Sequence, residues 1–178
     1  MQIRLTVNGK PVRADVTPRT SLADFLREAL NLTATHLGCE HGICGACTVT
    51  LNGQPIRACL TLAVACDGYE VRTLEGLLTD GIMLALRDAF HRHHGLQCGF
   101  CTPGMLVSAR DIIQRGKADS DSEIRKGLAG NICRCTGYTD IVKSVRKAAE
   151  ALSEADAEAL SEADKVRLPS GNVSKVPA

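Results

Sequence analysis

The stretch that decides the fold is Gly38-Cys39-Glu40-His41-Gly42-Ile43-Cys44-Gly45-Ala46-Cys47, and a fourth cysteine, Cys59, follows it. The spacing is C-x4-C-x2-C-x11-C. Three thiolates on one loop, with the fourth expected from the following strand, is the ligand order of a plant-type [2Fe–2S] cluster. Zinc also accepts four thiolates, but it favours C-x-x-C hairpins and suits the first gap less well. The glycines favour the cluster, because a loop wound closely round it needs backbone angles that glycine adopts without strain.

The residues around this loop predict a small sheet with one helix. The expected strands are 2–7, 12–16, 48–51, 56–59 and 70–73. Asn8-Gly9 and Asn52-Gly53 are hairpin signals that join the first four strands in pairs. Ser21 and Asp24 resemble a capping box that opens a short helix reaching about Leu30. We therefore expect a compact α+β sheet domain over residues 1–76.

After this domain the apolar period becomes helical. The expected helices run from about Gly81 to the histidines at 91–94, from Thr102-Pro103 to near Gly116, from Ser120 to about Ala129, and from Tyr138 to about Ala149. Thr102 is expected at the N-cap and Gly95 at the C′ position after the first of these helices. The pattern predicts a helical domain over 77–152. Residues 153–178 form a C-terminal extension, with a helical continuation to 163 and an irregular tail from 164.

The helical half has its own cysteines, which are Cys98, Cys101, Cys133 and Cys135. Their spacing is C-x2-C-x31-C-x-C, and each pair is expected at the N-terminus of a helix, where free N–H groups favour thiolates. Structural zinc is an alternative for this set taken alone. Beside the first motif, the set indicates a protein with two clusters.

Composition excludes several other classes of protein. A net charge of +1 and an aromatic content of 3% give no basis for nucleic-acid binding. The N-terminus reads as a strand and not as a signal peptide, and no apolar run is long enough to span a membrane. Nine cysteines in such a chain point to metal ligands in a reducing, cytoplasmic setting. Cys66 is expected to be a buried spectator, and the histidines at 91, 93 and 94 to end a helix, although metal binding by them is an alternative.

Three stretches carry a resemblance to a known family. They are Gly38-Cys39-Glu40 through Gly45-Ala46-Cys47-Thr48-Val49, Gln97-Cys98-Gly99-Phe100-Cys101-Thr102-Pro103-Gly104-Met105, and Gly130-Asn131-Ile132-Cys133-Arg134-Cys135-Thr136-Gly137-Tyr138. They resemble the iron–sulfur small subunit of the molybdenum hydroxylases, the family of xanthine dehydrogenase, aldehyde oxidoreductase and aerobic carbon monoxide dehydrogenase. The resemblance covers residues 2–150 and includes all eight cysteine ligands of the family in order.

The resemblance implies a plant-ferredoxin-like β-grasp domain followed by a four-helix-bundle domain. One cluster would be held by Cys39, Cys44, Cys47 and Cys59, and the other by Cys98, Cys101, Cys133 and Cys135. It further implies that Gln97 and Cys135 lie against the pterin of a molybdopterin cofactor in a large subunit. A medium, FAD-binding subunit would face the ferredoxin-like cluster, and the whole would be a dimer of heterotrimers.

The function implied is electron relay from the molybdenum centre through the helical cluster and the ferredoxin-like cluster to FAD. The partner subunit would hydroxylate a small substrate such as an N-heterocycle, an aldehyde or carbon monoxide, and the chain itself would be the non-catalytic subunit of an oxidoreductase. Two alternatives stand beside this one. The first is a freestanding two-cluster ferredoxin-like carrier, and the second is an interaction module stabilised by zinc.

Overall fold

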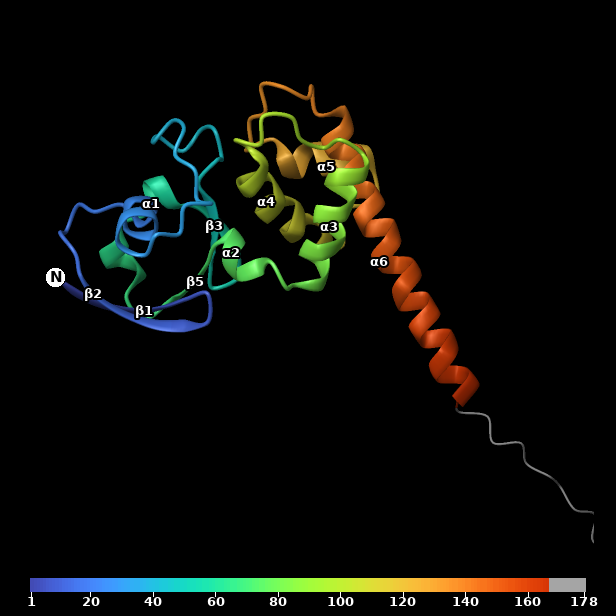
Figure 1. The fold of residues 1–178 in the computed structure, drawn as a ribbon, viewed down its shortest axis with the longest axis horizontal. Coiled ribbons are helices and arrows are strands. Elements are labelled where there is room, and N and C mark those ends of the chain that lie inside the picture. The colour runs from blue at the N-terminus through green and yellow to red at the C-terminus, as the bar shows by residue number, and fades with distance from the viewer. Residues whose placement is uncertain (167–178) are drawn as a thin grey trace, which may run out of the picture.

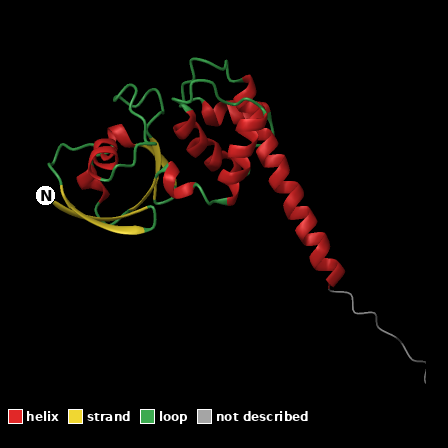
Figure 2. Ribbon diagram, in the orientation of Figure 1, coloured by secondary structure: helices red, strands yellow, loops and turns green. Residues whose placement is uncertain are grey.

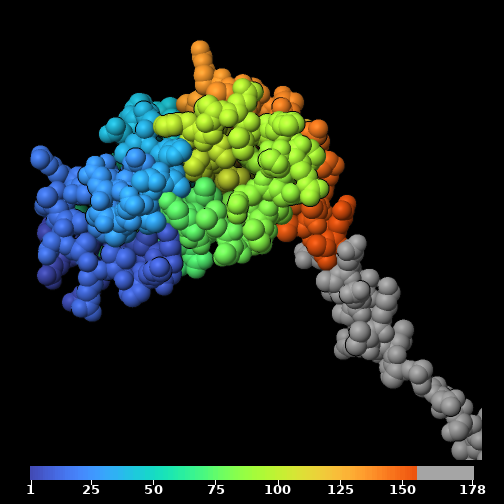
Figure 3. All heavy atoms as spheres, viewed as in Figure 1, coloured from blue at the N-terminus to red at the C-terminus, as the bar shows by residue number. Residues whose placement is uncertain are grey.

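The computed structural model describes the backbone of residues 1–166 and the side chains of residues 1–155. Figure 1 shows a sheet half, in blue to cyan, beside a helical half, in green to orange, from which the last helix projects. Buried apolar residues form one cluster within each half. The two halves touch along one side, so that the space-filling surface is continuous between them (Figure 3). The architecture is therefore α+β with two cores, as the sequence predicts.

Five strands form the sheet, in the order β2-β1-β5-β3-β4. Their bounds are β1 Gln2–Val7, β2 Lys10–Asp15, β3 Thr48–Leu51, β4 Gln54–Arg57 and β5 Glu70–Arg72. The pairing of β1 with β5 is parallel, whereas the other neighbours are antiparallel. The two hairpin turns have positive φ at both central residues, 51° and 76° at Asn8-Gly9 and 47° and 80° at Asn52-Gly53. These are the angles that Asn-Gly pairs adopt readily in tight hairpins, which confirms both turn predictions.

The helix of the sheet half differs from the expected one in its winding. The Ser21 hydroxyl accepts a hydrogen bond from the Asp24 amide at 3.0 Å, which confirms the N-terminal cap. After α1 (Leu22–Asp24), however, the chain continues as a π-helix over Phe25–Ala29. The Leu30 amide donates to the Phe25 carbonyl five residues back. The wider turn leaves Phe25 and Leu26 both inside the sheet core.

Cys59 does not lie on a strand, so the expectation of a strand over 56–59 was wrong at its end. Strand β4 stops at Arg57, and Ala58–Leu60 form a 3-10 turn. Ala58 is buried in the sheet core, and its amide donates to the Cys47 carbonyl. This hydrogen bond holds the 3-10 turn against Cys47, so that Cys59, the next residue, lies beside Cys47. A second 3-10 turn, Ala63–Cys66, buries Cys66 completely, as expected.

The helical half contains α2 Leu74–Leu77, α3 Gly81–Arg92, α4 Thr102–Gln114, α5 Asp121–Leu128 and α6 Thr139–Val166. The last four are the predicted bundle, whereas the short α2 was not predicted. Leu77 belongs to the helical core and Val71 to the sheet core, so the predicted boundary at residue 76 falls inside α2 and stays a prediction. The helical continuation predicted to residue 163 is present and runs on to Val166 (Figure 2), so the irregular tail predicted from 164 was wrong for residues 164–166. Residues 167–178 of that tail lie outside the described residues.

Two helix ends are displaced by one residue from their predicted positions. The N-cap of α4 is Cys101 and not Thr102, so Pro103 is the second helical residue. After α3, His94 takes the left-handed position with φ 56°, and Gly95 follows it, donating to the Phe90 carbonyl at 2.9 Å. Gly95 is needed there for space, because a Cβ would lie 2.7 Å from the Ser144 hydroxyl and 3.0 Å from the Phe90 ring. Among the described helices, none is long and apolar enough to cross a membrane.

Candidate metal centres

The 38–47 loop contains three left-handed residues, Glu40, Gly42 and Gly45, whose φ angles are 56°, 84° and 75°. This winding turns the Cys44 amide toward the Cys39 sulfur, which accepts its hydrogen bond at 3.3 Å. The Cys44 amide is also the main reason why the pKa of the Cys39 thiol is lowered to about 6. Cys39 is therefore largely a thiolate at neutral pH, which is the form that binds iron.

Cys47 and Cys59 form the other pair of the sheet half. Cys47 is buried behind the loop, and Cys59 is half-buried on its 3-10 turn. Burial raises the pKa of the Cys59 thiol to about 11, and the neighbouring Cys47 thiol adds to the rise. A metal that binds at Cys59 must therefore displace the proton of its thiol.

The helical half also brings its cysteines together as pairs. Burial raises the pKa of Cys101 to about 12, with a further contribution from the Cys133 thiol beside it. The Cys98 thiol is the largest cause of a raised pKa at Cys135, and these last two cysteines are exposed. For Cys133, burial works against ionisation, but hydrogen bonds from Thr136 and nearby amides outweigh it and lower the pKa. The Thr136 hydroxyl donates to the Cys133 sulfur at 3.2 Å.

The thiols of each half lie near one another in pairs. Within the described residues, no three histidine, cysteine or acidic side chains converge closely enough to hold a single ion. A tetrahedral zinc site needs four ligands around one point. The strongest thiol–thiol interactions join Cys39 with Cys44 and Cys47 with Cys59 in the sheet half, and Cys98 with Cys135 and Cys101 with Cys133 in the helical half. Weaker interactions join the two pairs of each half, such as Cys39 with Cys59 and Cys98 with Cys101. Two pairs in each half fit the two irons of a [2Fe–2S] cluster.

Two buried hydroxyl oxygens of the described residues have no hydrogen-bond partner, those of Thr35 and Thr102. Thr35 precedes Cys39 by four residues, and Thr102 follows Cys101 directly. A buried unpaired hydroxyl is costly in a folded protein, and sulfur is an acceptor that a bound cluster would add. The residues present therefore fit clusters at both places, with donors as well as thiolates.

The cysteine loops of the two halves are joined to each other by hydrogen bonds. The Ile132 amide donates to the Cys44 carbonyl at 2.8 Å, which places the residue before Cys133 directly on the 38–47 loop. The Asn131 side-chain amide donates to the Gly45 carbonyl at 3.0 Å, and Arg57 donates to the Gly130 carbonyl at 2.5 Å. Two sets of cysteines that are far apart in the sequence are thus held on adjoining loops.

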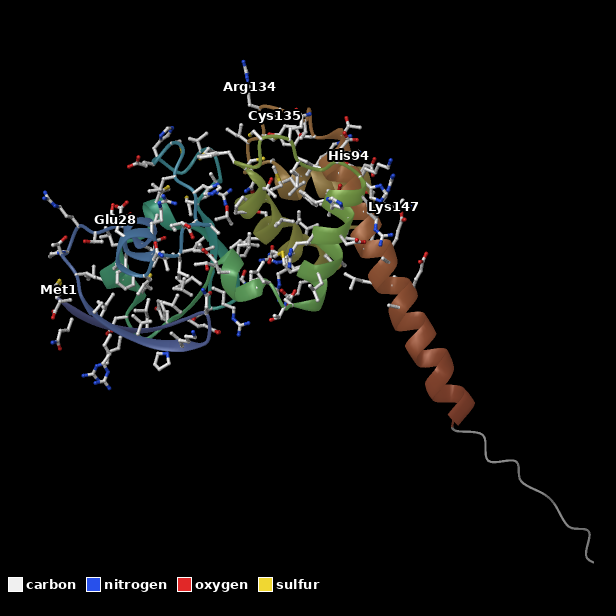
Figure 4. The ribbon with its side chains drawn as sticks, in the orientation of Figure 1. Met1, Glu28, His94, Arg134, Cys135 and Lys147 are labelled. Atoms are coloured by element: carbon white, nitrogen blue, oxygen red, sulfur yellow. The ribbon has the colours of Figure 1, made fainter. Side chains whose placement is uncertain are left out.

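The outer face of the helical half exposes Gln97 and Cys135, the two residues that the family resemblance places against a pterin. Figure 4 shows Cys135 and Arg134 on the outermost loop of this half, with Arg134 pointing away from the body. Phe100 and Ile132 lie beside them and are about half exposed, at 49% and 48%. The structure therefore brings these four side chains to the surface around the second set of cysteines.

Sequence reasoning missed the residues that join the halves. Asn131 is 2% exposed and hydrogen-bonds across the boundary, yet it was read only as part of a motif. Its neighbours Arg57 and Ser108 were not singled out at all. The available signal was weak: a polar residue two positions before a cysteine pair, in a stretch otherwise apolar or glycine.

Comparison with known proteins identifies both halves. Residues 5–69 match the family described as 2Fe-2S iron-sulfur cluster binding domain, and residues 73–146 match the family described as [2Fe-2S] binding domain. The fold and its two sets of cysteines thus define a protein with two [2Fe–2S] domains in one chain.

Individual relatives are subunits of particular oxidoreductases that contain such a chain. The chain is 51% identical over 150 residues to caffeine dehydrogenase subunit gamma of Pseudomonas sp. (strain CBB1), covering 83% of this chain and 90% of that one. It is 47% identical to the nicotine 6-hydroxylase small subunit of Paenarthrobacter nicotinovorans, covering 83% and 89%. The crystal structure of quinoline 2-oxidoreductase from Pseudomonas putida 86 superimposes with a TM-score of 0.80 at 49% identity, covering 86% and 96%.

The chain belongs to the family of iron–sulfur small subunits of the molybdenum hydroxylases. It is accordingly the non-catalytic iron–sulfur subunit of an oxidoreductase.

Proposed function

We propose that this chain relays electrons from a molybdopterin centre in a large partner subunit, through two [2Fe–2S] clusters, to FAD in a medium partner subunit. In this proposal Cys39, Cys44, Cys47 and Cys59 hold one cluster and Cys98, Cys101, Cys133 and Cys135 hold the other. When bound, a [2Fe–2S] cluster takes up and releases one electron at a time. The observation that carries the proposal is the position of two sets of four free cysteines on loops that hydrogen bonds join to each other.

The chain's own residues supply what such a relay needs around the metal. Amide and hydroxyl donors aimed at sulfur, such as the Cys44 amide and the Thr136 hydroxyl, stabilise the anionic thiolates and tune the potential. Cys47 is buried and Cys101 is half-buried, which keeps part of each site out of water. Because the two halves surround their cysteines with different donors and burial, we expect the two clusters to have different potentials.

Exposed apolar side chains beside each set of cysteines support partner subunits over a freestanding carrier. Ile43 and Leu60, which are 60% and 63% exposed, flank the cysteines of the sheet half. Phe100 and Ile132 flank those of the helical half. Apolar surface of this kind at a functional loop is typical of an interface. In the proposed assembly, a dimer of heterotrimers, Gln97 and Cys135 contact the pterin and the face with Ile43 meets the flavin subunit.

The relatives favour an N-heterocycle as the substrate of the complex. Caffeine, nicotine and quinoline, which appear in the names of three relatives, are all nitrogen heterocycles. Aldehydes and carbon monoxide are less favoured by these names. The pocket that selects the substrate lies in the proposed large subunit, so this part of the proposal rests on similarity alone.

The test is to express the chain with the genes that adjoin its own and to compare Cys98→Ser with Cys66→Ala. Cys66 is the control because it is buried and outside both sets of thiols. We expect two larger chains to co-purify. We also expect Cys98→Ser to abolish flavin reduction by substrate while the ferredoxin-like EPR signal remains, and Cys66→Ala to retain both.

Two results would contradict the proposal. A chain that purifies alone with both clusters, from cells that express its neighbours, would support the freestanding carrier. Flavin reduction at the native rate in Cys98→Ser would remove the helical cluster from the route.

A further inference from the structure

The contact between the two cysteine-bearing loops centres on one buried amide side chain. Asn131 is 2% exposed and lies two residues before Cys133. Its Nδ2 donates to the Gly45 carbonyl at 3.0 Å and lies 3.4 Å from the Thr48 hydroxyl, and both of these partners belong to the sheet half. Its Oδ1 accepts from the Ser108 hydroxyl on α4 at 2.8 Å. Nδ2 therefore links the two halves, and the bond from Ser108 to Oδ1 holds the amide in place within the helical half.

Neighbouring residues allow the two backbones to approach closely at this point. A Cβ on Gly45 would collide with the Gly130 carbonyl and lie 2.8 Å from the Asn131 amide nitrogen. A Cβ on Gly104, in the first turn of α4, would collide with the Gly45 carbonyl and lie 3.1 Å from that of Ala46. The Gly45–Ala46 end of the 38–47 loop thus lies in close backbone contact with Gly104 of α4 on one side and with Gly130 on the other.

The approach joins two predicted ligands by a short bonded path. The Ile132 amide, adjacent to Cys133, donates to the carbonyl of Cys44 itself at 2.8 Å. The Asn131 and Ile132 hydrogen bonds run to consecutive carbonyls, those of Gly45 and Cys44. Without Asn131, the Gly45 carbonyl would keep the bonds from the Thr48 amide and hydroxyl but would lose its bond across the boundary. The neighbouring bond from Ile132 to the Cys44 carbonyl would then lose the contact that supports it.

We infer that Asn131, oriented by Ser108, is a positioning residue that fixes the distance and the bonded path between the two clusters and so sets the rate of electron transfer between them. This inference rests on the proposed function, because it requires both clusters. The step it controls is transfer of one electron: the donor cluster is oxidised by one electron, the acceptor cluster is reduced by one, and no bond forms or breaks. Asn131 touches neither cluster's thiols, so it acts through the loops alone.

The contacts predict which properties change and which do not. Asn131 makes no hydrogen bond to a cysteine sulfur within the described residues, so the potential of each cluster is not expected to depend on it. The separation of the clusters does depend on it. A merely structural residue would instead change cluster content or overall stability and leave the inter-cluster rate of the loaded protein unchanged.

The experiment compares Asn131→Ala and Ser108→Ala with Ser144→Ala in the full chain carrying both clusters. Ser144 is the matched control because it is a fully buried hydroxyl of the same half, bonded only to Asp140 of its own helix. The readouts are iron content, the potential of each cluster from EPR-monitored titration, the magnetic splitting between the two reduced clusters, and the inter-cluster rate after pulse-radiolytic injection of one electron.

We expect Asn131→Ala to lower the inter-cluster rate about 10-fold, the effect typical of losing a residue that supports a metal site, and to reduce the splitting. Both potentials and the iron content should stay at wild-type values. Ser108→Ala should lower the rate by a smaller factor, because Nδ2 keeps its partners, and Ser144→Ala should leave it unchanged.

A wild-type rate and splitting in Asn131→Ala would overturn the inference. If Asn131→Ala loses a cluster, the inter-cluster rate of Ser108→Ala becomes the test, and a wild-type rate in Ser108→Ala would overturn the inference. Loss of clusters in both variants would also overturn it, because the contact would then be required for folding and not for positioning. Failure of the proposed function looks different: the wild-type chain itself would then lack one or both clusters.

Discussion

At the scale of single residues, Gly45 is required for two separate reasons, its backbone angle and its lack of a side chain. Its φ of 75° lets the 38–47 loop turn, and its missing side chain lets Gly130 and Gly104 approach. Gly53 has a similar φ, 80°, but a Cβ there would meet nothing within 4 Å. An alanine at Gly53 would therefore be strained only by its backbone angle, whereas an alanine at Gly45 would be strained by its angle and would also collide with its neighbours.

Gly45→Ala should accordingly destabilise the loaded chain by about 3 kcal/mol, and Gly53→Ala by about 1 kcal/mol, since only the first adds a steric collision to the strained angle. Denaturant titration followed by circular dichroism measures both. Equal losses of unfolding free energy in the two variants would mean that the two halves are not in close backbone contact at Gly45.

The cysteines could be found from the sequence because their spacing is itself the signal. Asn131 could not, because its importance comes from a carbonyl 86 residues away along the chain. Gln97 and Cys135 were selected by resemblance alone. The structure exposes both, and their contact with a pterin stays a prediction.

At the scale of elements, Asp80 stabilises the start of α3 in two ways. Its carboxylate accepts from the Met83 amide at 3.1 Å as an N-cap, and it accepts a two-pronged pair of bonds from Arg110 of α4 at 3.0 and 2.8 Å. The Arg110 guanidinium lowers the pKa of Asp80 below its ordinary value of 3.8. Ser120 caps α5 through a single bond from the Glu123 amide at 3.2 Å and has no ion pair to lose.

Asp80→Ala should cost about 2 kcal/mol, at the upper end for N-caps because Arg110 loses its partner as well, and Ser120→Ala about 1 kcal/mol. A carboxyl whose folded-state pKa is lowered stabilises the fold above the unfolded pKa and loses that contribution only as pH falls through the folded pKa. The loss in Asp80→Ala should therefore be equal at about pH 7.5 and pH 5.

Denaturant titrations at those two pH values check this. An Asp80→Ala loss that already shrinks at the lower pH would mean that Arg110 does not hold the carboxyl ionised.

Elements that depend on local chemistry were predictable, and elements that depend on tertiary packing were not. The Asn-Gly turns and the caps at Ser21 and Ser120 are encoded within three or four residues and were confirmed. The π-turn after α1 buries Phe25 and Leu26 against a sheet that the local sequence does not specify. The same applies to the 3-10 turn at Cys59, which forms because the Ala58 amide bonds to Cys47.

At the scale of the whole molecule, two independently cored halves place their cysteine loops on one side, and those loops meet (Figure 2). This arrangement separates the surroundings of the two predicted clusters while keeping the path between them short. Hairpin signals and the change to helical periodicity predicted both halves and their order, and the family resemblance added the β-grasp and four-helix-bundle folds. The contact between them, by Asn131, Ile132 and Arg57, required the structure.

The central claim is that this chain holds two distinct [2Fe–2S] clusters in separate surroundings. The most direct measurement is iron and sulfide analysis of the anaerobically purified chain together with EPR of the reduced protein. The account predicts about four irons and about four sulfides per chain, and two EPR signals of equal intensity that titrate at different potentials. Zinc in place of iron, or a single signal that accounts for all the iron, would contradict it.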